Sequence, residues 1–162
     1  MRHARKRAIS MLLLGLLAFV CLARAAPAPE AVFNTDQGSL RLADLRGKVV
    51  YLDFWAAWCS PCRSSFPWMN EMHARYADKG LVVLAVNLDK DPKELKAFLA
   101  QMPAQFRLAY DPQGKVAEQY QLKGMPSSYL IDRQGQIHQV HVGFRDKDKA
   151  ELEASIRQLI AK

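Results

Sequence analysis

Cys59 and Cys62, spaced as C-x-x-C, are the side chains of this sequence best suited to chemistry. Such a pair can form a structural disulfide, supply two ligands of a metal site, or exchange electrons as a reversible dithiol. A structural bridge closing so short a loop would add only about 2 kcal/mol to the free energy of unfolding. A chain of this length can also bury a core without one. The spacing therefore favours redox chemistry.

A metal site is the weaker alternative for this pair. No second C-x-x-C pair is present to complete four ligands, which leaves His73, His138 and His141 as candidates. His138 and His141 lie three residues apart in an expected strand, so their side chains point to opposite faces. Attachment of haem would require a histidine directly after the second cysteine, where the chain has Arg63. We expect no metal, and no cofactor other than the disulfide that the two cysteines form.

The residues around the cysteines indicate how the pair would react. The run Trp58-Cys59-Ser60-Pro61-Cys62 follows an apolar segment and precedes a helical pattern. Cys59 therefore lies at a helix N-terminus, where free N–H groups and the helix dipole favour a thiolate. We expect Cys59 to be exposed and to attack a disulfide, and Cys62, one helical turn later, to resolve the mixed disulfide. Ser60 and Pro61 would tune the stability of the thiolate and so the reduction potential.

Asp53 interrupts the apolar segment six residues before Cys59. If this segment is a central strand, the carboxyl is forced into the interior, where the loss of water raises its pKa. The carboxylate would then accept the proton of Cys62 as that thiol attacks the mixed disulfide. The alternative is a carboxyl at a sheet edge or in contact with water, without a role in the reaction.

Met125 and Pro126 directly precede a later apolar strand. Proline at the start of a strand is ordinary. A cis bond before Pro126 would instead expose the backbone of Met125 for pairing with an extended peptide. The residues alone leave both possibilities open.

The N-terminus has the pattern of a secretory signal peptide. Residues 1–8 are basic, residues 9–23 are almost all apolar, and Ala23-Arg24-Ala25 is a small-x-small cleavage pattern. The apolar run is shorter than the roughly 20 residues that span a bilayer, which favours cleavage over a retained N-terminal membrane anchor. We expect a signal peptide at 1–25, one domain at 26–162, and export to a bacterial periplasm or an equivalent space.

The distribution of charge excludes one class of partner. The 162 residues carry a formal charge of +7, but five of the 23 Lys and Arg residues lie in the first 25 positions. The remaining 18 basic residues face 16 acidic ones, which gives no electrostatic basis for binding nucleic acid. The composition, 50% apolar and 24% charged, is that of a folded domain.

The elements that hold these groups follow from the pattern of apolar residues. Residues 48–56 and 81–87 are nearly continuous apolar runs, typical of central strands covered on both faces. The helix that carries the cysteines should run to about Asp78, with Gly80 closing it. The other expected elements are a hairpin at 31–42, helices at 92–101, 113–120 and 146–160, and strands at 106–110, 127–132 and 136–142. The order β-α-β-α-β-α-β-β-α predicts an α/β fold around a mixed sheet.

The segment Phe54–Arg63, F-W-A-A-W-C-S-P-C-R, resembles the active-site segment of thioredoxin-fold proteins. Gly124–Asp132 resembles their cis-proline segment. The opening hairpin and the extra stretch at 91–120 are similar to the exported TlpA/ResA-like thiol–disulfide oxidoreductases, and the resemblance runs from about residue 31 to the C-terminus. It implies a thioredoxin-like fold: a mixed central sheet flanked by helices, with an N-terminal hairpin and a βα-type insertion before the cis-proline loop.

The resemblance also implies what the site binds and what surrounds it. It places an extended client peptide against Trp58, Met125 and Pro126. It implies client proteins with disulfides, a membrane electron donor of the DsbD/CcdA type, and a place in cytochrome c maturation. Asp53 stands where cytoplasmic thioredoxins have their buried acid and many exported relatives have Asn, and Ser65 stands where those relatives often have Glu. We expect a monomer.

These observations together favour a periplasmic enzyme that reduces disulfides in partner proteins. The reductive direction follows from the Ser-Pro dipeptide between the cysteines, which lacks the histidine of strongly oxidising dithiols. Two alternatives stay open: a disulfide oxidase or isomerase using the same cysteines in reverse, and a metal- or haem-binding chaperone that holds its ligand with them. The peroxidatic P-x-x-x-T-x-x-C motif of peroxiredoxins is absent.

Overall fold

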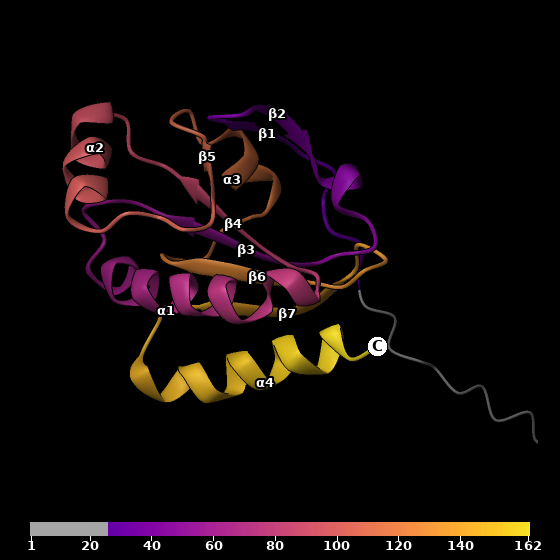
Figure 1. The fold of residues 1–162 in the computed structure, drawn as a ribbon. Coiled ribbons are helices and arrows are strands. Elements are labelled where there is room, and N and C mark those ends of the chain that lie inside the picture. Colours follow the sequence, from indigo (N-terminus) through magenta and orange to yellow (C-terminus); the bar gives the residue numbers. More distant parts are fainter. Residues whose placement is uncertain (1–25) are drawn as a thin grey trace, which may run out of the picture.

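A seven-stranded sheet with helices on both sides forms the described part of the chain (Figure 1). The computed structural model describes residues 26–162, so the expected signal peptide at 1–25 lies outside them. The strands are β1 (Val32–Thr35), β2 (Gly38–Arg41), β3 (Val49–Trp55), β4 (Leu81–Asn87), β5 (Arg107–Tyr110), β6 (Ser127–Ile131) and β7 (Ile137–Val142). The α-helices are α1 (Ser60–Tyr76), α2 (Pro92–Gln101), α3 (Lys115–Gln119) and α4 (Lys149–Ile160). Single 3-10 turns lie at Leu42–Leu45, Ala77–Lys79 and Asp146–Asp148.

The sheet is mixed, and its order is β2-β1-β5-β4-β3-β6-β7. β3 pairs in parallel with β4, and β4 pairs in parallel with β5. β6 runs antiparallel to β3, and the hairpins β1-β2 and β6-β7 extend the sheet at its two sides. The predicted α/β order, the N-terminal hairpin and the insertion α2-β5-α3 before β6 are all confirmed. β3 therefore lies inside the sheet, between β4 and β6.

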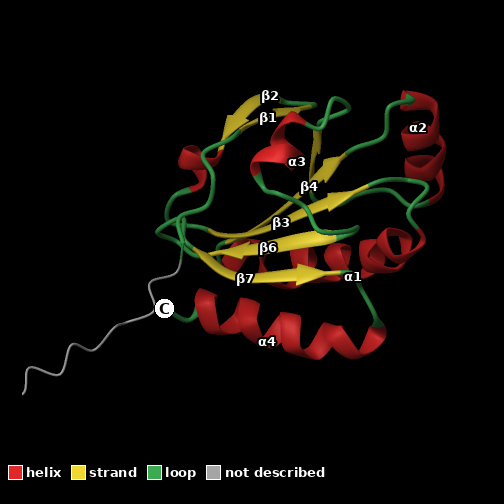
Figure 2. Cartoon of the chain, turned by 180° about the vertical axis from the view of Figure 1, so that it is seen from behind, coloured by secondary structure: helices red, strands yellow, loops and turns green. Residues whose placement is uncertain are grey.

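β3 is buried over its whole length because its two faces are both covered. Tyr51 and Trp55 pack among residues of α1 and α4, whereas Leu52 and Phe54 pack among residues of the β1-β2 hairpin and α3. Figure 2 shows α1 and α4 side by side along one side of the sheet, with α3 on the other. We call these two sides the α1 face and the hairpin face. Since side chains alternate along a strand, Asp53 belongs to the α1 face.

α1 begins directly after Cys59 and carries an apolar stripe against the sheet. Phe66, Met69 and Met72 are fully buried, at the helical spacing that the sequence predicted. α1 continues past Pro67, and a 3-10 turn extends it to Lys79. Gly80 then ends the segment with a left-handed φ of 97°, a conformation that glycine adopts without strain. This fixes the predicted end of the helix and leads the chain into β4.

α4 packs against the sheet through an apolar stripe of its own. α4 buries Leu152, Ile156 and Leu159 against the α1 face, as its pattern predicted. Within residues 26–162, no helix is both long and apolar enough to cross a membrane.

Candidate active site

Cys59 and Cys62 form a disulfide at the N-terminus of α1, directly beyond the end of β3. Their Cα atoms are 5.2 Å apart. Cys59 is the N-cap of α1, and its Sγ accepts a hydrogen bond from the Cys62 N–H at 3.3 Å. The sulfur of Cys59 therefore lies where the free N–H groups of the helix favour negative charge. The predicted placement of the pair at a strand-to-helix transition is confirmed.

The two cysteines differ in how they meet the surface. Cys62 is wholly buried, and Cys59 is 5% exposed. Cys59 nevertheless lines an open groove of about 640 Å³ beside the N-terminus of α1. The expectation of an exposed Cys59 is therefore wrong for this disulfide form, because the residue is buried and meets the surface only where it lines the groove. A client disulfide can reach Cys59 through this groove, whereas Cys62 is wholly buried.

The walls of this groove are mostly apolar and come from two distant parts of the chain. One wall is Trp58, Ser60 and Pro61 from the cysteine segment, and the other is Leu122, Lys123, Gly124 and Met125 from the loop before β6. Trp58 is 65% exposed, which is unusual for so large an apolar side chain. An exposed aromatic beside a reactive disulfide provides a contact surface for an extended apolar peptide.

The Met125–Pro126 peptide bond is cis, which decides between the two possibilities that the residues left open. Pro126 is buried, and its carbonyl accepts a hydrogen bond from the Gly143 N–H at 2.8 Å. The pairing of β6 with its neighbours starts only at Ser127, so the backbone of Met125 lies outside the sheet ladder and beside the groove. Its position fits the pairing with an extended peptide that the resemblance implies.

Asp53 is completely buried in the middle of β3, on the α1 face. The strand partners directly opposite it are Ala85 on β4 and Ser128 on β6. Ser128 Oγ donates a hydrogen bond to Asp53 Oδ1 at 2.8 Å, while Oδ2 has no partner among the described residues. Burial raises the pKa of Asp53 from an ordinary 3.8 to about 7, although the Ser128 hydrogen bond favours the anion. The alternative of an edge position in contact with water is therefore wrong.

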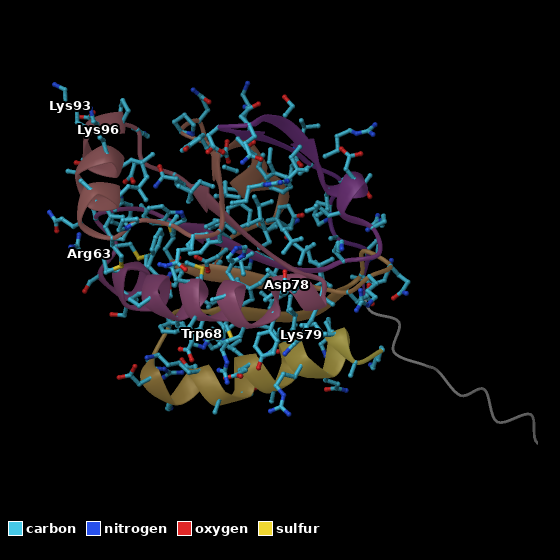
Figure 3. The ribbon with its side chains drawn as sticks, in the orientation of Figure 1. Arg63, Trp68, Asp78, Lys79, Lys93 and Lys96 are labelled. Atoms are coloured by element: carbon cyan, nitrogen blue, oxygen red, sulfur yellow. A yellow bond between two sulfur atoms is a disulfide. The ribbon has the colours of Figure 1, made fainter. Side chains whose placement is uncertain are left out.

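Ser65 and Arg63 are two polar residues of α1 that follow Cys62 closely in the sequence. Ser65 is buried, and its Oγ donates to the Cys62 carbonyl at 2.9 Å, which ties it to the first turn of the helix. The Arg63 guanidinium lies over the Phe98 ring of α2, 5.1 Å from the ring centre. Figure 3 shows Arg63 at the end of α1 that carries the disulfide. Lys93 and Lys96 lie at the other end of α2, away from Arg63. Arg63 thus packs against α2 and borders a second hollow beside Trp58.

Asp89 holds the loop before Cys59, and the sequence pattern alone did not single it out. Its side chain is almost fully buried and accepts hydrogen bonds from the Ala57 N–H at 2.9 Å and from Asn87 Nδ2 at 2.7 Å. The Leu88 N–H also donates to the Trp55 carbonyl at 2.9 Å. The signal was available as two polar residues, Asn87 and Asp89, at the end of a buried parallel strand, where the carboxyl ends of β3 and β4 meet.

No group of three or more His, Cys, Asp or Glu side chains within residues 26–162 lies together in a way that could hold a metal ion. His138 and His141 alternate along β7, as expected, with His138 exposed and His141 half-buried. Cys59 and Cys62 are bonded to each other as a disulfide. Cys59 is the half of this disulfide that lines the groove.

Comparison with known proteins agrees with this geometry. Residues 22–140 match the model of the AhpC/TSA family. The chain is 34% identical over 125 residues to the thiol-disulfide oxidoreductase ResA of a Bacillus cereus strain, covering 76% of this chain and 72% of the relative. It is 35% identical over 118 residues to ResA of Oceanobacillus iheyensis, covering 73% and 62%.

Solved structures share the fold. A Chlorobium tepidum protein assigned as a thiol:disulfide interchange protein DsbE matches with a TM-score of 0.81 at 50% identity, over 85% of this chain and 97% of that one. The exposed lipoprotein thioredoxin Etrx1 of Streptococcus pneumoniae matches with a TM-score of 0.68 at 29% identity, over 80% and 99%. The predicted thioredoxin-like fold is confirmed.

Proposed function

This chain belongs to the AhpC/TSA family and is a thiol–disulfide oxidoreductase, and we propose that it reduces disulfides of client proteins in the periplasm. The observation that carries the proposal is the Cys59–Cys62 disulfide, with Cys59 lining an apolar groove and Cys62 wholly buried. A groove of this kind admits one sulfur to the client and keeps the second for the internal step. The signal-peptide pattern at 1–25 supports the location.

The reaction begins from the reduced dithiol. The Cys59 thiolate attacks one sulfur of the client disulfide, which forms a mixed disulfide and releases the first client thiolate. Cys62 then attacks Cys59 Sγ, the Cys59–Cys62 bond forms, and the second client thiolate leaves. Two electrons pass to the client, and the chain remains as the disulfide present in the structure. A membrane donor of the DsbD/CcdA type would return the electrons.

Asp53 serves as the proton acceptor of the second step in this proposal. Cys62 must lose its proton to attack, and it is buried away from water. Asp53 is buried on the α1 face of the sheet, the face against which the cluster that contains Cys62 packs. A carboxyl with a pKa of about 7 is ionised in part of the molecules at neutral pH, so it can take up a proton and release it again.

Client docking uses the two walls of the groove. Trp58 and Met125 line the groove and contact the client peptide, and the Met125 backbone pairs with it. Pro126 is buried directly after Met125, so we propose for it a place beside the bound peptide and not in the groove wall. Ser60 and Pro61 set the stability of the Cys59 thiolate. The apolar lining favours clients with apolar residues next to the cysteine.

The direction of electron flow is tested by equilibrium with thiol buffers. The purified protein is equilibrated with mixtures of reduced and oxidised glutathione, and the fraction of disulfide is measured by thiol alkylation and mass spectrometry. A reductase has a potential close to thioredoxin, about −270 mV, whereas a strong oxidant lies near about −120 mV. A value near the latter would replace the proposal with its alternative, an oxidase or isomerase.

The client class is tested by trapping. The Cys62→Ala variant, expressed with its leader, keeps the attacking sulfur but cannot resolve the mixed disulfide. We expect disulfide-linked adducts with exported proteins, with apocytochromes c among them if the chain works in cytochrome c maturation. Cys59→Ala is the matched control and should trap none. A chain that only carries a metal ion or haem would form no adducts in either variant.

A further inference from the structure

Three buried side chains on the α1 face are linked by two hydrogen bonds. The Tyr51 hydroxyl donates to Ser128 Oγ at 2.8 Å, and Ser128 Oγ donates to Asp53 Oδ1 at 2.8 Å. Tyr51 is 1% exposed and Ser128 is 2% exposed. Tyr51 and Asp53 come from β3, and Ser128 is the residue of β6 opposite Asp53. These hydrogen bonds therefore connect β3, which precedes the cysteine segment, with β6, which follows the cis-proline loop.

The direction of these bonds has a chemical consequence. A serine hydroxyl has one proton, and here that proton points to Asp53, while the tyrosine proton fills the acceptor site of the serine. This arrangement stabilises the Asp53 anion against the cost of burial. It also occupies Oδ1, so a proton that arrives at Asp53 binds Oδ2, which is buried and has no partner among residues 26–162.

We propose that Ser128 and Tyr51 are positioning residues of the reaction: they orient the Asp53 carboxyl so that Oδ2 receives the proton, and they set the pH at which it does so. The proposal rests on the proposed function of Asp53 as the acceptor of the Cys62 proton. Ser128 acts directly through its hydrogen bond, and Tyr51 acts through Ser128. Neither residue is among those that line the groove, so neither is expected to contact a client.

Few other titratable side chains lie on the elements that pack next to Asp53. β4 presents Ala85, which does not titrate. The start of α1 contributes the two cysteines, which do not titrate while they form a disulfide, and the helix also carries His73, whose Nδ1 is buried without a hydrogen-bond partner among the described residues. β7 places His141 opposite Ser128, where its Nε2 lies 3.4 Å from Asp148 Oδ2. Burial raises the pKa of Tyr51 well above its usual value, so this hydroxyl keeps its proton throughout the range of interest. Titration of the oxidised protein therefore follows Asp53 through a band that the Asp53→Asn variant identifies.

The experiment measures the protonation of Asp53 directly and without turnover. The carboxyl stretching band of oxidised protein is followed by infrared difference spectroscopy against pH, and the Asp53→Asn variant identifies the band. Ser128→Ala should raise the midpoint by about one pH unit, and Tyr51→Phe by less, because one charge-stabilising hydrogen bond is lost or weakened. Ser128→Thr keeps the hydroxyl and should restore the midpoint of the unsubstituted protein, which also guards against a variant that merely folds poorly.

Two control variants on β6 remove hydroxyls that are not bonded to Asp53. Tyr129→Phe removes a buried hydroxyl on the hairpin face, and Ser127→Ala removes a hydroxyl that bonds the Gly124 carbonyl. Both should leave the Asp53 midpoint unchanged. An equal shift in Tyr129→Phe and Tyr51→Phe, or no shift in Ser128→Ala, would overturn the proposal.

The same variants are then compared in the reaction itself. The rate at which Cys62 resolves a mixed disulfide on Cys59 is measured against pH, and its midpoint should follow the infrared midpoint. If Asp53→Asn leaves this profile unchanged, the proposed role of Asp53 as acceptor fails, whatever Ser128 does. If Asp53→Asn changes the profile but Ser128→Ala does not, the role of Asp53 stands and the positioning role of the hydroxyls is wrong.

Discussion

The two faces of the central sheet bury the same kind of side chain with opposite consequences. On the hairpin face, the Tyr129 hydroxyl donates to the Tyr120 carbonyl at 2.6 Å, and the Tyr120 hydroxyl donates to the Pro29 carbonyl at 3.1 Å. On the α1 face, the Tyr51 hydroxyl leads through Ser128 to Asp53. A backbone carbonyl cannot change its charge near neutral pH, but a carboxyl can. One face therefore uses its hydroxyls for stability, and the other ends in a group that can move a proton.

The difference extends to what burial does. Burial raises the pKa of Tyr120 and Tyr129 on the hairpin face, which keeps them neutral and leaves their charge constant. On the α1 face, burial raises the pKa of Asp53 to about 7, which brings its change of charge into the neutral range. The same physical cause thus makes one cluster inert and the other responsive. Adjacent residues of β3 and β6 belong to different faces, so substitutions one position apart can test this contrast.

The largest effect is expected at the disulfide. Cys59→Ala should lower the rate of client or model-disulfide reduction by at least about a thousandfold, because the attacking sulfur is gone. Insulin reduction with a chemical electron donor measures it. The fold should persist, since the bridge closes a short loop. Activity within about tenfold of the unsubstituted chain would show that another group attacks and would remove the functional distinction between the faces.

Asp53→Asn should have the next largest effect, on the pH dependence of stability. In the folded chain the pKa is about 7, and the ordinary value is 3.8, so between these limits the unfolded chain has lost the proton that the folded chain still holds. The free energy of unfolding therefore falls as pH rises from about 4 to about 7, by up to about 4 kcal/mol from this group. Asn cannot ionise, so the variant should lose this decline and be more stable than its parent at about pH 8.

Urea unfolding of both oxidised proteins between about pH 4 and pH 9 checks this expectation. Parallel stability curves over that whole range would mean that Asp53 is not held in the interior as a titrating group. A difference that grows only above about pH 8 would point to a different group.

Asp89→Ala tests the clamp that joins the carboxyl ends of β3 and β4. The Ala57 N–H and Asn87 Nδ2 would both lose a buried acceptor, which should lower the free energy of unfolding by about 2–3 kcal/mol. The loop before Cys59 should also loosen, so amide exchange at Ala57 should speed up more than amide exchange in the middle of β3. Uniform acceleration across the sheet would indicate a general loss of stability and no specific hold on the loop.

Tyr129→Phe should have the smallest effect, and it represents the hairpin face in the comparison. Its hydroxyl bonds only a backbone carbonyl, so its loss should cost about 1 kcal/mol of unfolding free energy. The pH dependence of reduction should keep its shape and midpoint. Calorimetry and a rate profile measure the two quantities. A displaced midpoint would show that the faces are electrostatically coupled, which would weaken the contrast between them.

The sequence predicted the elements well because most of them are encoded locally. The continuous apolar run of β3, the glycine that ends the α1 segment, and the alternation in β7 are all features of neighbouring residues. The burial of Asp53 followed from the same run. The cis bond before Pro126 had to come from a resemblance, because the residues themselves allow both isomers.

The contacts of the site were harder to predict because they depend on register. Ser128 and Asp53 are 75 positions apart, and only the pairing of β3 with β6 brings them opposite each other. Ala57 and Asp89 meet for the same reason, through the pairing of β3 with β4. Cys59 is less exposed than the sequence predicted, because the loop before β6 forms a second wall of its groove. This loop is distant from Cys59 in the sequence. A single sequence contains no signal for these registers.

The most direct test of the unequal roles of the two cysteines is their alkylation in the reduced protein. Reduced chain is treated with iodoacetamide across a range of pH, and the modified peptides are quantified by mass spectrometry. Cys59 should react first, with half its maximal rate at a pH below about 8.5, the ordinary value for a free thiol, while Cys62 stays protected. Equal modification of both cysteines, or faster modification of Cys62, would contradict the assignment of Cys59 as the attacking sulfur.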